Sequence, residues 1–160
     1  MPDLTQGAVI VTGGSRGIGA SISVELARAG LHVACLSRSG ELPDAGSLDA
    51  DAQKRLAAIH CDITDAASVD AAFAEVPTLF GKPIVGLVNN AGIHLQGPSA
   101  SFPIADFERV MQTNASSVLL ASQVAYPYLR EAGSALIVNI GSFYDKLGVR
   151  SRAELSRMLD

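Results

Sequence analysis

The residues from Thr12 to Gly19, with the sequence TGGSRGIG, constrain the fold of this chain more than any other stretch. They follow a short, apolar, β-branched run at residues 8–11, which is typical of a strand buried on both faces. After them, apolar residues recur at helical spacing, at Ile18, Ile22 and Leu26. A strand, a glycine turn and a helix bring backbone N–H groups and the positive end of a helix dipole to one point. This arrangement suits a phosphate group.

Composition narrows the possible partners. The 160 residues are 48% hydrophobic and 18% charged, which is ordinary for one soluble domain with a substantial core. The net charge of −4 provides no basic field that would recruit nucleic acid or an anionic membrane. The sequence has no apolar run of membrane-spanning length, and its first residues lack the positive charge of a signal peptide. We therefore expect a cytoplasmic protein without nucleic-acid or membrane partners.

The cysteines and histidines point to no metal or disulfide chemistry. Cys35 and Cys61 both lie in strand-like runs, which favours buried, reduced thiols. The histidines, His32, His60 and His94, are not spaced from these cysteines as metal ligands would be. No metal site is predicted.

The glycine spacing at Gly13, Gly17 and Gly19 does not match the common G-x-G-x-x-G pattern, but it does match T-G-x-x-x-G-x-G. That pattern resembles the cofactor loop of the classical short-chain dehydrogenase/reductase family, a Rossmann-type group of nicotinamide enzymes. A tight turn without a ligand is the alternative interpretation. The resemblance implies that a cofactor is bound by Thr12, Gly13, Ser15, Arg16, Gly17, Ile18 and Gly19.

The end of the second expected strand, residues 31–36, bears on the choice of cofactor. An acidic residue here would favour NAD(H), because it accepts hydrogen bonds from the ribose hydroxyls. Residues 37–39 contain no acid, and Arg38 is suited to pair with a 2′-phosphate. Arg16 supplies a second cation. Taken with the resemblance, the two arginines favour NADP(H) over NAD(H), although both could instead be solvated surface residues.

Residues 39–51 have no sustained apolar stripe and are expected to form a loop. A third strand at residues 55–60 follows. The resemblance implies that Asp62 lies beside the adenine ring, with Ile63 in the same site. The alternative is that Asp62 or Thr64 caps the next helix.

A helix is predicted over residues 66–80, and a fourth strand over residues 84–88 leads into Asn89-Asn90-Ala91-Gly92. This NNAG sequence matches the family motif after its fourth strand. Asparagine amides can tie adjacent strand ends together, and the small residues leave room for a cofactor. The resemblance assigns Asn90, Ala91 and Gly92 to the cofactor site.

A long helix is expected from about Ile104 to Arg130, with breaks near Pro103 and Pro127 as an option. Its apolar face is expected to contain Phe107, Val110, Met111, Val118, Ala121 and Ala125. Asn114 falls on that face, where a polar amide must find hydrogen-bond partners. The resemblance implies a catalytic role for Asn114, which would hold a water in the proton relay, and a homo-oligomer formed through this helix. An asparagine satisfied by nearby backbone is compatible with the catalytic role.

The fifth strand is expected at residues 135–140, followed by Gly141 and Ser142. In the family, the serine in this place orients the substrate carbonyl or hydroxyl by hydrogen bonding. Ser142 matches that place, at the family's spacing from Asn114. A serine after a strand is otherwise a common turn residue.

The resemblance fails beyond this point. In the family's Tyr-x-x-x-Lys pair, the tyrosine transfers a proton and the lysine lowers the tyrosine pKa. The positions of this pair would fall on Leu155 and Leu159. The only lysines are Lys54, Lys82 and Lys146, and none has a tyrosine four residues earlier. Tyr144 has a glycine four residues later.

The resemblance covers residues 8 to about 150, expected to be a dinucleotide-binding domain, and residues 151–160 form an atypical C-terminal tail. We expect a truncated member of the family, arising from a shifted reading frame, an alternative end or a truncated gene. Without further strands, the fifth strand would be a sheet edge with exposed apolar surface. We then expect a marginally stable or aggregation-prone product unless something covers that face.

The resemblance therefore predicts an α/β fold: a three-layer, Rossmann-type, doubly wound parallel sheet with strand order 3-2-1-4-5. The implied activity is NADP(H)-dependent hydride transfer between nicotinamide and a small-molecule carbonyl or alcohol. The alternatives are a fragment that binds the cofactor or an intact subunit without turnover, and an inactive fragment.

Overall fold

A computed structural model describes residues 4, 6–46 and 48–141. Five parallel strands form one sheet in the order β3-β2-β1-β4-β5, as the family resemblance predicts. Their bounds are β1 Ala8–Thr12, β2 His32–Ser37, β3 Leu56–His60, β4 Ile84–Asn89 and β5 Leu136–Asn139. Because every pairing is parallel, the carboxyl ends of all five strands meet at one edge of the sheet.

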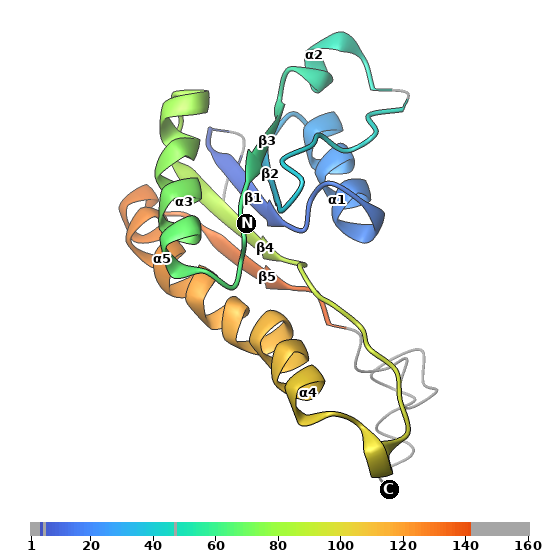
Figure 1. Ribbon diagram of the computed structural model, residues 1–160. Helices are drawn as coiled ribbons and strands as arrows, with labels where there is room; N and C mark the ends of the chain where they lie inside the picture. Colours follow the sequence, from blue (N-terminus) through green and yellow to red (C-terminus); the bar gives the residue numbers. More distant parts are fainter. Residues whose placement is uncertain (1–3, 5, 47, 142–160) are drawn as a thin grey trace, which may run out of the picture.

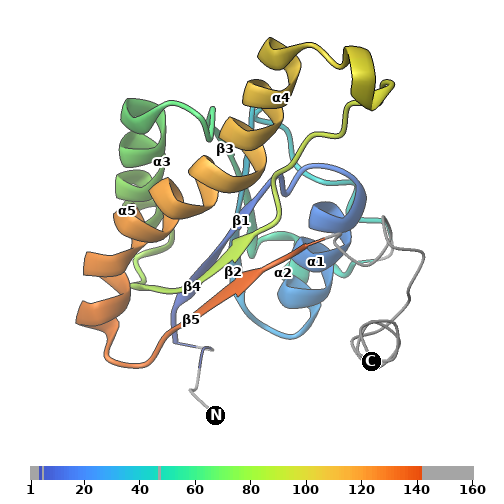
Figure 2. The same ribbon diagram turned by 90° about the horizontal axis from the view of Figure 1, so that it is seen from below.

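Helices cover both faces of the sheet (Figure 1). On one face lie α1, Gly17–Arg28, and the short α2, Ala50–Gln53. On the other lie α3, Ala66–Phe80, and α5, Ser117–Ala132. A single 3-10 turn, Ser99–Ser101, precedes α4, Ile104–Met111. α4 continues the line of α5 in both views (Figure 2), and Figure 1 shows it extending past the end of the sheet, where it forms a lobe at one end of the molecule.

The core consists of two layers, one on each face of the sheet. Alternate residues of each strand point to opposite faces, so a strand covered on both sides must be apolar throughout. Ile10 and Leu36 pack with Phe73 of α3, while Val9 and Val11 pack on the α1 side. All five residues of β1 are buried. This double burial explains the continuous apolar run that precedes the glycine loop.

The helix predicted over residues 104–130 differs in detail from the observed one. It is interrupted by a π-helical turn at Gln112–Ser116, and it continues to Ala132 with Pro127 inside α5. The prediction of a single apolar face that packs on the core is wrong for α4, because Phe107 and Met111 are 53% and 44% exposed. Figure 1 shows that α4 extends past the end of the sheet, so none of the described strands lies beneath it.

The other differences are small. The segment expected to be a loop, residues 39–51, is irregular up to Asp49, whose side chain accepts a hydrogen bond from the Ala52 N–H and caps α2. No helix in the described part of the chain is both long and apolar enough to cross a membrane.

Candidate functional site

The glycine loop between β1 and α1 is closely packed on one side and exposed on the other. A Cβ atom on Gly19 would lie 2.2 Å from the Gly13 carbonyl oxygen and 2.4 Å from Asn90 Nδ2, so no side chain fits there. Gly13 and Gly17 have φ angles of 65° and 56°, which favour glycine. At Gly17 a Cβ would meet no atom within 4 Å. The packing therefore brings backbone, without intervening side chains, to an exposed surface.

Helix α1 begins at this exposed surface. Arg16 occupies its capping position and is extended, with φ −151° and ψ 164°, but its side chain makes no capping hydrogen bond. The first N–H groups of a helix have no partner within the helix, and they carry the positive end of the helix dipole. Ser15 is half-buried, and Ile18 is 66% exposed. This end of α1 is suited to an anion.

Thr12 is buried and connects the first strand to the fourth. Its hydroxyl oxygen accepts hydrogen bonds from the N–H groups of Asn90 and Ala91, both at 3.0 Å, and donates to the Val88 carbonyl at 3.4 Å. Because only 2% of Thr12 is exposed, its side chain contacts other protein groups and not solvent. The sequence places Thr12 in the cofactor loop, and the structure adds that its hydroxyl is already fully engaged.

The NNAG segment ties strand ends together, as predicted. Asn90 Nδ2 donates to the carbonyl oxygens of Thr12 and Gly13, at 3.0 and 3.3 Å. On the other side, the Asn89 side chain reaches Asn139 at the end of β5. Gly92 lies beside Asn114, since a Cβ at position 92 would be in van der Waals contact with Asn114 Oδ1 at 3.4 Å. Sequence reasoning missed Asn139 and its contact, because nothing local in the sequence marks it.

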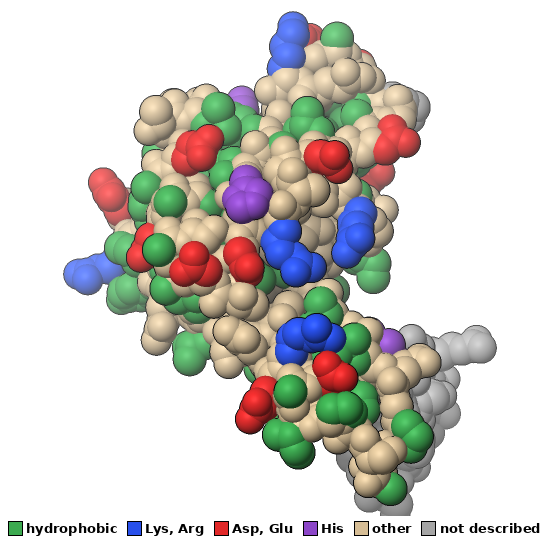
Figure 3. Space-filling view, viewed as in Figure 1, with side chains coloured by type: hydrophobic (Ala, Val, Ile, Leu, Met, Phe, Trp, Pro, Cys, Tyr) green, Lys and Arg blue, Asp and Glu red, His purple; other side chains and the backbone are tan. Residues whose placement is uncertain are grey.

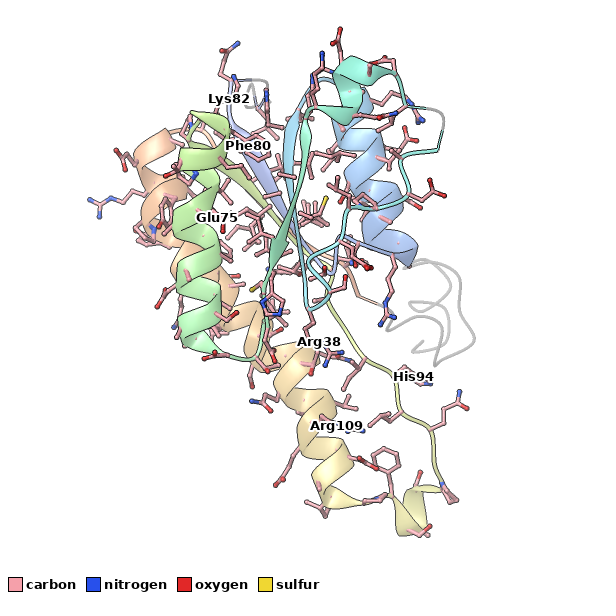
Figure 4. The ribbon with its side chains drawn as sticks, turned by 45° about the horizontal axis from the view of Figure 1, so that its top comes forward. Arg38, Glu75, Phe80, Lys82, His94 and Arg109 are labelled. Atoms are coloured by element: carbon pink, nitrogen blue, oxygen red, sulfur yellow. The ribbon has the colours of Figure 1, made fainter. Side chains whose placement is uncertain are left out.

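Arg38 and Asp62 lie after β2 and β3, at the same edge of the sheet as the glycine loop. Arg38 is exposed, and Figure 4 places it at this end of the molecule, opposite Phe80 and Lys82. In the view of Figure 3, basic side chains gather where the sheet domain meets the α4 lobe, and acidic side chains lie around them. This edge therefore offers local positive charge on an acidic protein.

The Asp62 carboxylate is held by its neighbour Thr64. Its Oδ1 atom accepts hydrogen bonds from the Thr64 hydroxyl at 2.7 Å and the Thr64 N–H at 2.9 Å. These bonds lower the pKa of Asp62, and the charge of Arg38 lowers it further. The alternative that Asp62 or Thr64 caps α3 is wrong, because Asp65 does so by accepting from the Ala67 N–H. Ile63 is half-buried and packs against the core.

Asn114 lies in the π-helical turn between α4 and α5. Its Oδ1 accepts from the Ile93 N–H and its Nδ2 donates to the Ile93 carbonyl, both at 2.8 Å. Two reciprocal bonds fix the loop after β4 to the helix. The expectation that Asn114 needs partners is confirmed, and the partners are backbone atoms. Asn114 is nonetheless exposed and not part of a core stripe.

Ser142 follows β5 in sequence but lies outside the described residues, as do Tyr144, Leu155 and Leu159. Of the predicted site, the structure brings together the glycine loop, Asn90 to Gly92 and Asn114 through the contacts above.

Among the described residues no three His, Cys, Asp or Glu side chains could hold a metal ion. Both cysteines are free and buried, as predicted, and burial raises the pKa of each thiol.

Comparison with known proteins gives a consistent result. The family model described as short chain dehydrogenase matches residues 7–154. The ketoacyl reductase HetN of Nostoc sp. is 34% identical over 93% of this chain and 52% of its own length. Levodione reductase of Leifsonia aquatica is 32% identical over 86% of this chain and 53% of its own.

A solved structure of similar fold is a double mutant of a Serratia marcescens short-chain dehydrogenase/reductase. It has a TM-score of 0.72 and 32% identity, over 93% of this chain and 62% of the other. The chain thus spans about half the length of the curated relatives it matches.

Proposed function

Because this chain belongs to the short-chain dehydrogenase/reductase family, we propose that it binds a nicotinamide dinucleotide and forms part of an oxidoreductase. A bound nicotinamide would supply hydride transfer to or from a carbonyl or alcohol carbon of a small molecule. The chain's own residues would bind and orient the dinucleotide at the carboxyl edge of the sheet. The curated relatives are about twice as long as this chain. The oxidoreductase activity of a full-length protein is therefore part of the proposal.

One observation carries the proposal: the exposed, uncapped start of α1 lies against backbone from which side chains are excluded. A pyrophosphate needs close approach to several N–H groups at the start of a helix. Gly19 lets the start of α1 pack directly against Gly13 and Asn90, where a Cβ would collide. The loop is held in this shape by Thr12 and Asn90. The residues present therefore fit a dinucleotide.

We further propose that the preferred cofactor is NADP(H) over NAD(H). Arg38 follows β2, where the Rossmann fold meets the adenosine ribose, and no acid stands beside it at residues 37–39. A guanidinium can form two parallel hydrogen bonds to a 2′-phosphate. Arg16 is exposed at the start of α1 and offers a second positive charge. Asp62 and Ile63 would line the adenine side.

Fluorescence titration with NADPH and NADH tests both parts. Arg38→Ala is expected to weaken NADPH binding by on the order of tenfold to a hundredfold and to leave NADH binding nearly unchanged. Arg130→Ala, on the last turn of α5, is the matched control and should change neither. Equal losses for both nucleotides on Arg38→Ala would contradict the NADP(H) preference. Failure of both nucleotides to bind would contradict the dinucleotide site.

For the chemistry, we propose that Ser142 orients the substrate oxygen by hydrogen bonding. Asn114, with its side chain engaged by Ile93, would fix the helix and loop that flank the site. The sequence has no tyrosine four residues before a lysine, so the usual proton donor is not among these 160 residues. Turnover on a panel of ketones separates the outcomes. Turnover supports the oxidoreductase, whereas binding alone limits the proposal to a dinucleotide-binding part.

We also propose self-association through the helix that carries Asn114. Apolar side chains on α4 and α5 are strongly exposed: Ile104, Phe107, Met111, Leu119 and Tyr126. A second copy would remove them from water, at about 25 cal/mol for each Å² buried. Light scattering after size exclusion should detect a dimer that Phe107→Glu dissociates. A monomer at all concentrations would contradict this proposal.

A further inference from the structure

Asn89 lies at the end of β4 and is only 4% exposed. Its Nδ2 group donates to Asn139 Oδ1 at 2.8 Å and to Ser122 Oγ at 3.3 Å. An amide nitrogen carries two hydrogens, so both are used. The Ser122 hydroxyl donates to the Val118 carbonyl at 2.7 Å, which leaves its oxygen as the acceptor for Asn89. The Asn89 carboxamide is thus fixed from β5 and from α5 together.

The backbone of Asn89 makes the same connection. Its carbonyl accepts a hydrogen bond of 2.8 Å from the Ile140 N–H, one residue past the end of β5. Side chain and backbone of one residue therefore both fix the carboxyl end of β5. This end needs such fixing, because β5 is the edge strand of the described sheet and Ile140 is 41% exposed.

The next residue makes the opposite connection. Asn90 Nδ2 binds the carbonyls of Thr12 and Gly13, on the other neighbour of β4. Two successive asparagines thus reach in opposite directions, one to the glycine loop and one to the end of β5. Both side chains are held by hydrogen bonds, and one planar peptide joins their Cα atoms, so a displacement of one is expected to reach the other through the backbone torsions between them.

We propose that Asn139 and Ser122 are positioning residues. They orient the Asn89 carboxamide, and through Asn89 and Asn90 they couple the end of β5 to the glycine loop. The coupling to a bound dinucleotide rests on the proposed function, whereas the hydrogen-bonded linkage itself does not. The role needs only an acceptor at position 139, because Asn89 is the donor. Aspartate would serve equally, and the isosteric leucine would not.

Amide hydrogen exchange on the full chain, followed residue by residue by NMR, tests the linkage without ligand. Asn139→Leu is expected to speed exchange of the Ile140 amide roughly fivefold, the effect of one lost hydrogen bond. In Asn139→Asp the exchange rate of the Ile140 amide should stay within about twofold of the wild-type rate. The rate in Ser122→Ala should lie between the rates in the two Asn139 variants. The Val33 amide, which donates to the Arg55 carbonyl on the far side of the sheet, is the internal control.

Equal exchange in the leucine and aspartate variants would overturn the proposal. So would faster exchange at Val33 in the leucine variant, which would reveal general loss of stability. A second arm adds saturating NADPH. Binding should slow exchange at Ile140 in the wild type and in Asn139→Asp, but not in Asn139→Leu. NADPH that binds and leaves Ile140 unchanged in the wild type would overturn the coupling. Absence of NADPH binding would refute the proposed function alone, because the ligand-free comparison still decides the linkage.

Discussion

Strands β1 and β5 are similar in composition but have very different surroundings. β1 reads AVIVT and is buried at every residue, while β5 reads LIVN and exposes Leu136 and Ile137 by 46% and 40%. β1 has a strand on either side and helices on both faces, whereas β5 has one neighbouring strand in the described sheet. An apolar, β-branched run therefore specifies a strand, and the neighbouring elements decide whether it contributes to the core.

The largest expected effect contrasts one phenylalanine in the centre with one at the periphery. Phe73 of α3 is fully buried against the sheet, and Phe73→Ala should lower the free energy of unfolding by about 3–5 kcal/mol, because it leaves a cavity. At protein concentrations low enough for the monomer, Phe107→Ala on α4 should cost about 1 kcal/mol or less, since Phe107 is 53% exposed. Urea denaturation measures both. Equal losses would contradict the difference between the two regions.

A smaller effect tests the polar link at the centre. Thr12→Val keeps the side-chain shape but leaves the Asn90 and Ala91 N–H groups without their acceptor. The expected loss of unfolding free energy is about 1–3 kcal/mol, by chemical denaturation. Thr12→Ser retains the hydroxyl and should lose clearly less. If serine and valine are equally destabilising, the hydroxyl is not what joins β1 to β4.

The amino end of β2 should show a pH dependence. His32 Nδ1 is buried without a hydrogen-bond partner among the described residues, and the ring meets Phe80 edge-on at 5.2 Å between centroids. Burial lowers the pKa of His32 in the folded state, and the charges of Lys82 and Arg55 lower it further. As the pH falls through the unfolded value of about 6.5, the unfolded chain gains a proton that the folded chain resists. Stability should therefore fall below that pH.

Unfolding at about pH 7.5 and about pH 5.5, on either side of the unfolded pKa, checks this expectation. The loss of stability on acidification should be smaller in His32→Phe, which does not titrate. Other groups titrate in both proteins, so the difference between the two losses isolates His32. An identical loss in the variant would mean that His32 is protonated as readily in the folded chain as in the unfolded one.

The smallest effect is expected at the β5 edge. Leu136→Thr should change the free energy of unfolding by no more than about 0.5 kcal/mol, because Leu136 is nearly half exposed and threonine suits a strand. Leu87→Thr, in the buried β4, is the matched control and should cost several times more. A large loss at Leu136 would show that this strand is covered in solution.

Much of the fold can be predicted because its signals are local. The run before Thr12, the glycine spacing and the alternation of strands and helices predict an α/β chain, and the family resemblance that they carry predicts the strand order that the structure confirms. The predicted bounds of α3 match the observed ones, since Asp65 and Gly81 stand on either side of it. The sequence does not single out Asp65 as the cap, because Asp62, Thr64 and Asp65 are equally suitable residue types. Only geometry distinguishes them.

The errors on α4 have a different cause. The spacing of Phe107 and Met111 matches one face of a helix and so predicts a place in the core. Helical spacing defines a face but not what lies opposite it. The π-helical turn adds one residue to the turn that holds Asn114, and α4 continues past the end of the sheet. No local pattern predicts where a helix leaves the layer it packs on.

The sequence by itself determined that this is an α/β chain with a glycine loop between its first strand and first helix, because strand and turn signals depend on neighbours along the chain. The tertiary structure alone decided which polar groups meet. Asn139 lies 50 residues from Asn89, and Thr12 lies 78 residues from Asn90. Such contacts depend on strand order and register, which place distant residues side by side at a few ångströms. Neither partner has a local feature that reveals the other.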